Sequence, residues 1–497
     1  MTRLFTRRSG TTPPPAADVP HNRWDRLKPP KADDWKPTRT VSVVVPAFQC
    51  QRELDLTFAA LSQQTYPAAL LQIVVVDDGS DPPLQRPESG RDLDVVMLRQ
   101  ENSGFGSGKA RNAGVEAASG ELLILLDADM IPAPSQVEAH ARWHHTARDL
   151  VTLGWRVHLD IDGLSEEDVA SAARAGSAER MAKAFAEREL GGVQWIEGFV
   201  ERTKQLTTPR PDHFRIFTGG NSAMSADLWR EAGGMHVFGV RGIEDTELAY
   251  RLSNLGAVFV PVLDAMNWHQ GPSYFQSERK ARAKHERVPL LANYVPIGGF
   301  RSTSGGRSYA VPALALIIPV GDAPPAGVVE LVDAAFAGSF QDISVTLLAA
   351  ADYPEVDFLR DSFASDSRVR VAQDEGRPPF ELVGDTPVFV LLPAEAVPGH
   401  ETLATVFSRL TGGTIGALHL TVPGCHPRRA MLHAYATGPS RRAARIAADT
   451  GTDWEATVGS VFGETWAAGA DVGVKPFDEG AAGVAAEHAV QEAARPE

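Results

Sequence analysis

Short apolar runs alternate with amphipathic stretches along the N-terminal half of the chain. Residues 41–48 (VSVVVPAF) form an apolar run broken by a Pro, and apolar residues at helical spacing follow in RELDLTFAALSQQ, residues 52–64. A second run, LQIVVVDDGS at 71–80, ends in two Asp residues and a Gly-Ser turn. Runs this short and this rich in β-branched residues predict strands buried on both faces, and the stretches between them predict helices.

The series continues toward residue 132. VVMLRQENSGFGSGKARNAGVEAASG (95–120) predicts a strand, a Gly-rich loop and a helix, and ELLILLDADMIP (121–132) predicts a further buried strand. Strands that alternate with helices predict the α/β class, with a mostly parallel sheet between two helical layers. Ligands of such sheets bind at the carboxyl ends of the strands, which is where the polar residues of this chain stand.

The same rhythm returns in the C-terminal half. Residues 314–354 can be laid beside 41–82, and PVFVLLPAEAVP (387–398) overlays 121–132 without a gap. We therefore expect a duplicated domain. The expected organisation is a flexible N-terminal arm (1–40), a first domain (41–300), a linker around TSGGRSYAVP, a second domain (310–476) and a disordered tail (477–497).

The second copy departs from the first at its polar ends. Pro393 stands where Asp127 stands, and Glu395 where Asp129 stands. We expect the second domain to keep the strands and to lack the chemistry of the first.

Composition narrows the class of protein. The chain has 497 residues, 43% of them hydrophobic and 22% charged, which is typical of a globular protein of two domains. Its formal charge of -15 and the lack of a basic face argue against nucleic acid as a partner. Only Cys50 and Cys425 are present, without metal-ligand spacing, which indicates a reducing compartment and hence the cytoplasm.

No apolar run approaches the roughly 20 residues that a membrane span needs, and we expect no signal peptide. The basic arm RWDRLKPPKADDWKP (23–37) leaves peripheral contact with the inner membrane face open, although a loosely packed tail is the favoured interpretation.

Two carboxylates follow the buried run 122–126. Asp127 and Asp129 are spaced so that both side chains project the same way, because side chains alternate along an extended chain. Such a pair can hold a hard divalent cation and leave positions for phosphate oxygens. The pattern alone is weak evidence, since Asp residues also cap turns. Asp78 also ends a buried strand and is expected at the same sheet edge, while one of Asp77 and Asp78 fits an Asx turn.

The Gly-rich loop carries positive charge at a helix start, from Lys109 and Arg111. It is not a P-loop, which needs Gly at position 103 and Ser or Thr after the Lys, and its Gly spacing does not fit a dinucleotide fingerprint.

Further polar residues follow in the second part of the first domain. Glu244 and Asp245 precede the amphipathic run TELAYRLSNLG, so the helix dipole is expected to favour their ionised forms. An ionised carboxylate can accept a proton from an attacking hydroxyl, and ordinary first-turn acids are the alternative. His269 follows a strand that is expected to end near Leu263, and a lone His is usually structural unless it reaches the edge that carries Asp129.

Taken together, VSVVVPAF, VVVDDGS, GKARNAG, LLDADMIP, FTGGNSAM, GIEDTEL and WHQ resemble, in this order, the family 2 glycosyltransferases with a GT-A fold, which are inverting enzymes that use nucleotide sugars. The resemblance covers residues 41–271. It implies that Asp245 is the catalytic base beside Glu244, and that Asp129 and His269 bind Mn²⁺ or Mg²⁺. It also implies that the nucleotide sugar is bound by Pro46, Ala47, Phe48, Asp78, Lys109, Arg111, Asp127, Ala128, Gly219, Gly220 and Asn221.

Several alternatives stay open at this point. A nucleotidyltransferase could share the fold, a noncatalytic protein could bind nucleotide sugars, and a two-site polymerase would need a working second carboxylate pair. The segment 160–211 has helical spacing and either covers the acceptor site or packs as an ordinary helix. A UDP-sugar is the default donor. The acceptor is a glycan, a lipid-linked sugar, a peptide or a small molecule, and self-association is undecided.

Overall fold

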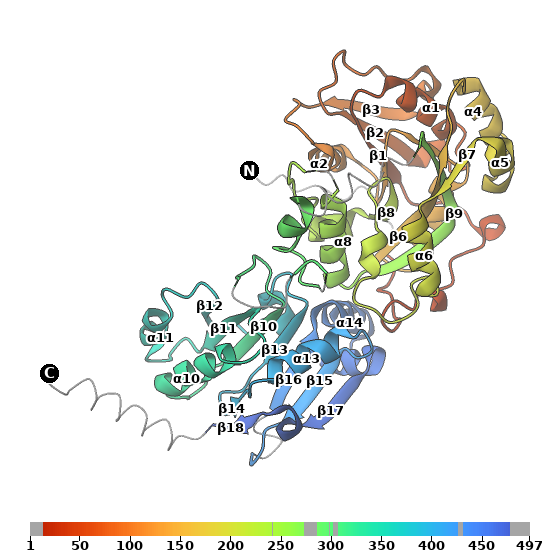
Figure 1. The fold of residues 1–497 in the computed structure, drawn as a ribbon. Coiled ribbons are helices and arrows are strands. Elements are labelled where there is room, and N and C mark those ends of the chain that lie inside the picture. Colours follow the sequence, from red (N-terminus) through yellow and green to blue (C-terminus); the bar gives the residue numbers. More distant parts are fainter. Residues whose placement is uncertain are drawn as a thin grey trace.

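The computed structural model describes residues 13–240, 242–272, 286–297, 299–301, 307–425 and 431–477. These residues form two α/β domains, each built on its own sheet, that lie one above the other in Figure 1. The predicted α/β class is thereby confirmed. Residues 302–306 of the predicted linker, and the predicted tail after residue 477, lie outside the described residues.

The sheet of the first domain runs in the order β3-β2-β1-β4-β8-β6-β9-β5, and β7 pairs with β6. Strands β3, β2, β1 and β4 are mutually parallel, as the sequence predicts, whereas β8 is antiparallel to both of its neighbours. Its strands are β1 (Val41–Ala47), β2 (Leu71–Asp77), β3 (Asp94–Arg99), β4 (Leu122–Leu126), β5 (Met130–Pro132), β6 (Leu150–Leu159), β7 (Glu189–Gly192), β8 (Asn221–Ser225) and β9 (Val258–Gln270).

Helices cover both faces of this sheet. Val43 and Val45 of β1 pack with Phe58 of α1, while Val44 packs in the cluster that contains Leu248 of α8. Side chains at successive strand positions therefore pack against opposite helical layers. Because both faces of the strands are buried, the strands are unbroken apolar runs in the sequence. The helices are α1 (Gln51–Leu61), α2 (Ser107–Ala117), α3 (Gln136–Trp143), α4 (Glu166–Ala173), α5 (Ala178–Phe185), α6 (Gln194–Arg202), α7 (Ala226–Glu231) and α8 (Glu244–Asn254).

The sheet of the second domain runs in the order β12-β11-β10-β13-β16-β15-β17, with a separate pair β14-β18. Its strands are β10 (Leu314–Pro319), β11 (Ile343–Ala349), β12 (Val369–Gln373), β13 (Val388–Leu391), β14 (Ala396–Val397), β15 (Ala417–Thr421), β16 (Met431–Ala436), β17 (Glu464–Ala468) and β18 (Lys475–Pro476). Its helices are α10 (Pro325–Phe336), α11 (Val356–Ser362), α12 (Pro379–Leu382), α13 (Thr402–Thr411), α14 (Thr437–Thr450) and α15 (Trp454–Thr457).

The two sheets have the same topology. If β10, β11, β12 and β13 are matched to β1, β2, β3 and β4, and β16, β15 and β17 to β8, β6 and β9, the strand order is the same throughout. Every matched pair also has the same sense, parallel or antiparallel. This agreement is what a duplicated domain requires. The domain boundaries themselves stay predictions.

The two domains also differ between the third and fourth strands of their sheets. In the first domain the eleven-residue helix α2 connects β3 to β4. In the second domain the corresponding segment holds only α12, which has four residues. The second copy therefore lacks the helix that carries Lys109 and Arg111, in addition to the Asp pair.

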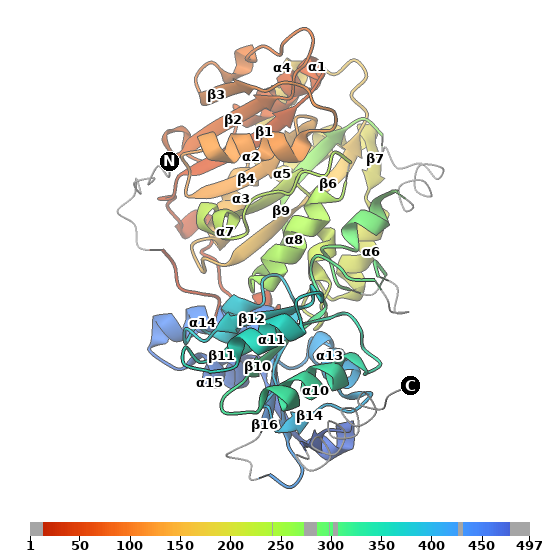
Figure 2. The ribbon, with the colours of Figure 1, turned by 90° about the vertical axis from the view of Figure 1, so that its left-hand side faces the viewer.

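Residues 13–40, the described part of the N-terminal arm, pack against both domains, although a flexible segment was expected. Ala17 and Val19 are buried, and the backbone N–H of Ala17 donates to Asp149 of the first domain at 2.8 Å. The backbone N–H of Ala16 donates to Asp449 of the second domain, also at 2.8 Å. The arm is held because it fills apolar space and satisfies polar groups on both domains at once. Figure 2 shows its described part running along the domain boundary.

Both tryptophans of the arm pack against rings of the protein. The ring of Trp24 lies 5.6 Å from that of Trp143, and the ring of Trp35 lies 5.0 Å from that of His145. These side chains are therefore used inside the fold. Among the described residues, no helix combines the length and hydropathy needed to cross a bilayer.

The segment 160–211 supplies α4, α5, β7 and α6. Val169 of α4 and Phe185 of α5 join a buried cluster with Leu56 of α1 and Trp268 of β9. The packed-helix alternative therefore describes α4 and α5. Helix α6 lies closer to the site, because Ile196 lines a small pocket together with Thr218, the residue before Gly219.

A test of the arm follows from Asn22. Its side-chain amide donates to the carbonyls of Leu206 and Phe259 at 3.0 and 2.9 Å and accepts from the N–H of Phe259 at 2.8 Å. Asn22→Ala leaves these buried backbone groups unpaired, so we expect a loss of about 2 kcal/mol in the free energy of unfolding, measured by urea denaturation. Arg26→Ala, at an exposed position of the same arm, should change the urea midpoint little, and equal losses in both variants would contradict the packed arm.

Candidate active site

The carboxyl ends of β2, β1 and β4 form one edge of the first sheet. Because β1 lies between its two neighbours, Asp78 and Asp127 stand on either side of the residues that end β1. Ala47 is buried, and its carbonyl accepts the N–H of Asp78 at 2.9 Å. Phe48 follows with 47% of its surface exposed. An exposed aromatic ring at this edge offers an apolar face on which a planar ligand can stack.

The two consecutive Asp residues after β2 have different tasks. Asp77 accepts the backbone N–H of Ser80 at 2.8 Å and pairs with Arg99 at 2.8 Å, so it closes the turn. Asp78 accepts the side-chain amide of Gln100 at 2.5 Å. A Cβ on Gly106 would lie 2.5 Å from Oδ2 of Asp78, so the Gly-rich loop closes directly onto this carboxylate. One of the two Asp residues was expected to close an Asx turn. Asp77 does close this turn, but through the N–H three residues on instead of two.

The segment Asp127-Ala128-Asp129 forms a turn instead of the predicted extended chain, because the N–H of Met130 donates to the carbonyl of Asp127 at 3.2 Å. Asp127 and Asp129 are partly exposed, whereas Ala128 points into the apolar core with 5% exposure. Ala128 was expected to contact the nucleotide sugar, and the structure corrects this expectation, because its methyl group packs under the sheet. Its carbonyl accepts the hydroxyl of Thr57 at 2.7 Å.

His269 reaches the edge that carries Asp129. The Nε2 atom of His269 lies 3.5 Å from Oδ2 of Asp129, because Met130 of β5 pairs with His269 of β9. The strand was expected to end near Leu263, but β9 continues through Gln270. His269 therefore stands within a strand, where the ladder fixes its position.

Arg111 is the centre of the carboxylate cluster. Its guanidinium is 95% buried and lies 2.5 Å from Asp127 and 3.9 Å from Asp245. Burial would lower the pKa of Arg111, but the charges of Asp127, Asp245 and Glu244 raise it. Arg111 was expected to contact the nucleotide, and the structure instead encloses it between carboxylates that it holds in place. Lys109 lies exposed on the same helix, and its contact with the nucleotide stays a prediction.

The two glycines before β8 permit the close approach of this cluster. A Cβ on Gly219 would lie 2.6 Å from Cζ of Arg111, and one on Gly220 would lie 2.5 Å from Oδ2 of Asp127. The N–H of Gly219 also donates to Asp245 at 3.0 Å. Any side chain at these two positions would separate the carboxylates from Arg111. The close packing of the cluster therefore requires Gly at both positions. Whether the pair also lines a sugar pocket stays a prediction.

Asn221 does not face a ligand, contrary to expectation. Its Oδ1 accepts from Gln136 and lies 3.0 Å from Nε2 of His140, and its Nδ2 donates to the carbonyls of Trp155 and Ala265. Four protein partners use the hydrogen-bonding capacity of the amide. Asn221 therefore ties β8 to its neighbours beneath the site.

Glu244 and Asp245 begin α8, as the sequence predicts. The helix dipole was expected to favour the ionised forms of these two side chains, and other effects of the site act against it. Burial raises the pKa of Glu244, and burial raises the pKa of Asp245 although Arg111 and the N–H of Gly219 oppose the rise. Desolvation therefore outweighs the favourable charge and hydrogen bond that these carboxyl groups receive. A carboxylate with a raised pKa is a better proton acceptor than an ordinary one.

Arg156 and His158 of β6 belong to the site and were not predicted. Strands β6 and β9 are parallel, with His158 opposite His269, and the two rings lie 4.7 Å apart. The charge of Arg156 lowers the pKa of Asp245 and so opposes the effect of burial. The i, i+2 spacing in WRVH places both side chains on one face, but only the pairing of β6 with β9 brings that face to the site.

The site can supply two ligands to a divalent cation. Asp129 and His269 offer a carboxylate oxygen and an imidazole nitrogen, which suit Mn²⁺ and Mg²⁺ together with further oxygen ligands. No group of three or more His, Cys, Asp and Glu residues in the described part of the chain is arranged to hold a metal. The remaining ligands would have to be water and phosphate oxygens. A cavity of about 230 Å³ lies away from this cluster, at the boundary between α8 and α14.

The first domain is similar to known glycosyltransferases. Residues 42–208 match the family model described as Glycosyl transferase family 2. The hyaluronan synthase of Pasteurella multocida is 29% identical over 269 residues, which are 52% of this chain and 27% of that protein. The validoxylamine A glucosyltransferase of Streptomyces hygroscopicus subsp. limoneus is 30% identical over 229 residues, which are 43% of this chain and 47% of that protein.

These matches span less than half the length of either relative. Among solved structures, a mannosyltransferase from Pyrobaculum calidifontis in complex with GDP-Man and Mn²⁺ is 18% identical and covers 54% of this chain and 67% of that one. The TM-score of this comparison is 0.35.

The raised pKa of Glu244 makes a prediction about stability. Because the pKa of Glu244 is higher in the folded than in the unfolded state, the wild type loses stability as pH rises from the ordinary value of 4.5 through the folded value. Glu244→Gln removes the buried charge and should raise Tm by about 2 °C at pH 8, with a smaller gain at pH 4.5, measured by thermal unfolding. A gain that is larger at pH 4.5 than at pH 8 would show that the direction is wrong.

Proposed function

We propose that this chain, which carries a family 2 glycosyltransferase domain, is a metal-dependent inverting glycosyltransferase that moves a sugar from a nucleoside diphosphate to an acceptor hydroxyl. The observation that supports this most is the meeting of Asp127 and Asp245 around Arg111, next to the pair of Asp129 and His269. These residues come from α2, the end of β4, α8 and β9, which are far apart in the sequence.

The edge of the sheet divides into a donor side and an acceptor side. On the donor side, Phe48 and Asp78 flank the end of β1 and would receive the nucleoside, with stacking on the ring and a hydrogen bond to the carboxylate. Asp127 would face the ribose. Asp129 and His269 would hold Mn²⁺ or Mg²⁺, which supplies charge neutralisation to a diphosphate leaving group.

On the acceptor side, Asp245 would act as the base. Its carboxylate takes the proton of the acceptor hydroxyl while the oxygen forms a bond to the anomeric carbon. The bond from that carbon to the diphosphate breaks, and the diphosphate leaves with the electron pair. Attack from the face opposite the leaving group inverts the anomeric centre. The raised pKa of Asp245 favours its role as proton acceptor.

The substrates are narrower proposals. We take a UDP-sugar as the donor and a glycan as the acceptor, because a hyaluronan synthase and a chondroitin synthase are among the relatives. A small-molecule acceptor is supported by the likeness to validoxylamine A glucosyltransferase. We propose a cytoplasmic enzyme whose second domain is noncatalytic, since Pro393 and Glu395 replace the carboxylate pair.

Nucleotide release identifies the donor and the metal requirement. The chain should release a nucleoside diphosphate from one of a panel of UDP-, GDP- and dTDP-sugars with Mn²⁺ and an acceptor glycan, and EDTA should abolish the release.

Asp129→Ala removes a metal ligand and should weaken metal-dependent binding of the nucleoside diphosphate at least tenfold, measured by calorimetry. Glu395→Ala in the second domain is the matched control and should leave release unchanged. Metal-independent release by the wild type would contradict the metal assignment.

The base is tested by an isosteric change. Asp245→Asn keeps the size of the side chain and removes its basicity, so we expect transfer to fall at least a hundredfold, the lower range for loss of a general base. Binding of the nucleoside diphosphate should stay within about twofold, because the donor side does not use this carboxylate. Transfer that equals that of the wild type would show that another group takes the proton.

A further inference from the structure

Helix α8 connects the candidate site to the second domain. Its first turn carries Glu244 and Asp245, and its last residue is Asn254 at the domain boundary. Eleven residues of α-helix span about 16 Å, so one rigid element reaches from the proposed base to the neighbouring domain. Figure 1 shows α8 standing above α14, and Figure 2 shows the same helix running down toward the second domain.

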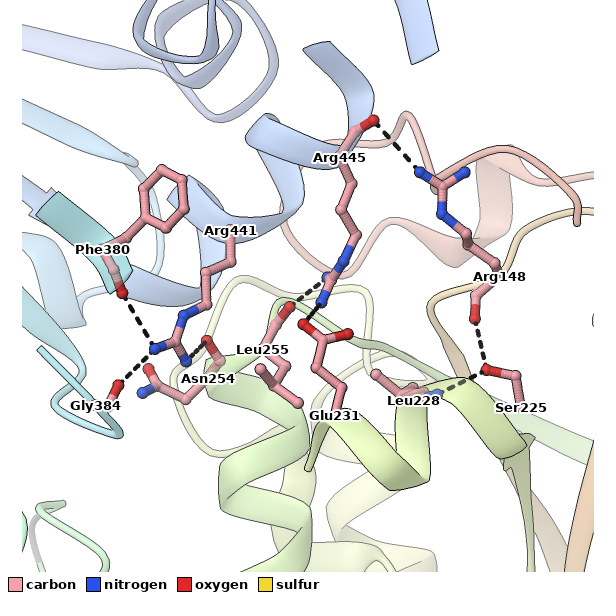
Figure 3. A network of polar contacts seen from close by, with 10 residues as sticks. All are labelled: Arg148, Ser225, Leu228, Glu231, Asn254, Leu255, Phe380, Gly384, Arg441 and Arg445. Carbon is pink, nitrogen blue, oxygen red and sulfur yellow. Dashed lines mark hydrogen bonds and ion pairs between the residues drawn. The ribbon is translucent and has the colours of Figure 1, made fainter. Parts of the chain in front are cut away.

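Two arginines of α14 bind the carbonyl groups at the C-terminal end of α8. Arg441 donates from Nη1 to the carbonyl of Asn254 at 3.2 Å, and Arg445 donates from Nη1 to the carbonyl of Leu255 at 2.5 Å (Figure 3). The last carbonyls of a helix lack partners within the helix and carry its negative dipole end. Two guanidinium groups from another domain therefore cap α8 with both hydrogen bonds and charge.

The guanidinium groups of both arginines make further hydrogen bonds that hold them in place. Arg441 also donates to the carbonyls of Phe380 and Gly384, at 3.2 and 2.6 Å, in the second domain. Arg445 also donates to Oε1 of Glu231 at 2.5 Å, at the end of α7 in the first domain. Figure 3 shows these contacts converging on the two guanidinium groups. Because each guanidinium group is held from two directions, its own position is fixed. It therefore also fixes the position of the C-terminal end of α8.

Other contacts lock the same end of the helix. The hydroxyl of Tyr250 donates to the carbonyl of Asp385 at 2.5 Å. A Cβ on Gly256 would lie 2.5 Å from the carbonyl oxygen of Gly438, and one on Gly438 would lie 2.6 Å from that of Ser253. The backbones after α8 and at the start of α14 thus approach at a distance that only Gly allows.

Within its own domain α8 is held from the side. Glu247 pairs with Arg251, which also donates to the carbonyl of Gly234 at 2.8 Å, and Leu248 and Leu252 are fully buried. These contacts fix which face of α8 meets the sheet. The contacts with α14 lie at the end of the helix instead and oppose movement along its axis.

We propose that the second domain positions the base, with Arg441 and Arg445 as positioning residues that set how far Asp245 projects into the site. The proposal rests on the proposed function, in which Asp245 accepts the proton. A shift of about 1 Å in a reacting group can cost on the order of a hundredfold in rate, so control of the axial position of α8 matters for transfer. Positioning of the base would also be a role for the noncatalytic second domain. This role requires the sheet and α14 of that domain but no carboxylate pair in it.

The test is the double variant Arg441→Met/Arg445→Met in the full chain. Methionine keeps much of the apolar side chain and removes the donors, so kcat for transfer should fall about tenfold or more. Binding of UDP with Mn²⁺ should stay within about twofold, because the donor side is built from the ends of β1, β2 and β4 and from His269 of β9, none of which contacts Arg441 or Arg445. The double variant Arg441→Lys/Arg445→Lys keeps the charge at the helix end and should recover part of kcat. A loss in UDP binding as large as that in kcat would overturn the proposal.

A matched control separates positioning from stability. Val345→Ala removes apolar packing in the core of the second domain, on a strand away from α14, and should lower Tm with kcat nearly unchanged. Arg409→Met, at an exposed position of α13, should change neither. If Val345→Ala lowers kcat as much as the arginine double variant, the second domain acts only through stability and the proposal fails.

Hydrogen exchange gives a readout that does not depend on transfer. The amides of residues 243–249, in the first turns of α8, should exchange faster in the Met double variant than in the wild type and should be unaffected in Val345→Ala. Absence of transfer in the wild type with every donor would refute the proposed function, while the exchange result still decides whether α14 orders the base end of α8. Unchanged exchange in the double variant would overturn the proposal.

Discussion

The buried guanidinium of Arg111 is the interaction on which the site depends. A buried cation is costly unless carboxylates and hydrogen-bond acceptors surround it, and Arg111 has Asp127 and Asp245 within 3.9 Å. Each partner comes from a different element, so this one charge ties α2 to the end of β4 and to the start of α8. The Gly-Gly pair before β8 follows from the same constraint, because any side chain there would separate the charges.

The same arrangement explains the electrostatics of the site. Burial raises the pKa of Asp245 and of Glu244, and a single guanidinium does not offset the crowding of carboxylates. The two carboxyl groups at the start of α8 therefore bind protons more readily in the folded protein than free carboxyl groups do. Such a shift suits the proposed role of Asp245 as a proton acceptor.

The second domain shows what remains when this constraint is absent. It keeps the strand order and the sense of every matched pair, but its four-residue α12 replaces α2, and no counterpart of Arg111 follows its third strand. Its strands are held by apolar burial, which needs no carboxylates. Three sets of contacts join the two copies along one boundary. They come from residues 13–40 of the N-terminal arm, from Gly256 and Gly438, and from Arg441 and Arg445 of α14. The second copy is therefore an integral part of the fold.

Much of the architecture was predictable from local pattern. Spacing along the chain sets the runs that became β1, β2 and β4, the acids that begin α8 and the gapless overlay of 121–132 on 387–398. Strand and helix periods are local properties, and side chains buried on both faces of a sheet must be apolar wherever the sheet lies. The sequence by itself therefore determined the fold class, the duplication and the residues that end at the active edge.

Only the tertiary structure decided what those residues do. Arg111 and Asn221 look like ligand-binding residues in the sequence, yet each is enclosed by protein partners that lie far away along the chain. Arg156 and His158 join the site only because β6 pairs with β9, and the pKa of Asp245 rises because burial outweighs the charge of Arg111. Hydrogen-bond saturation, desolvation and strand pairing depend on distances between remote segments, and a local pattern carries no information about those distances.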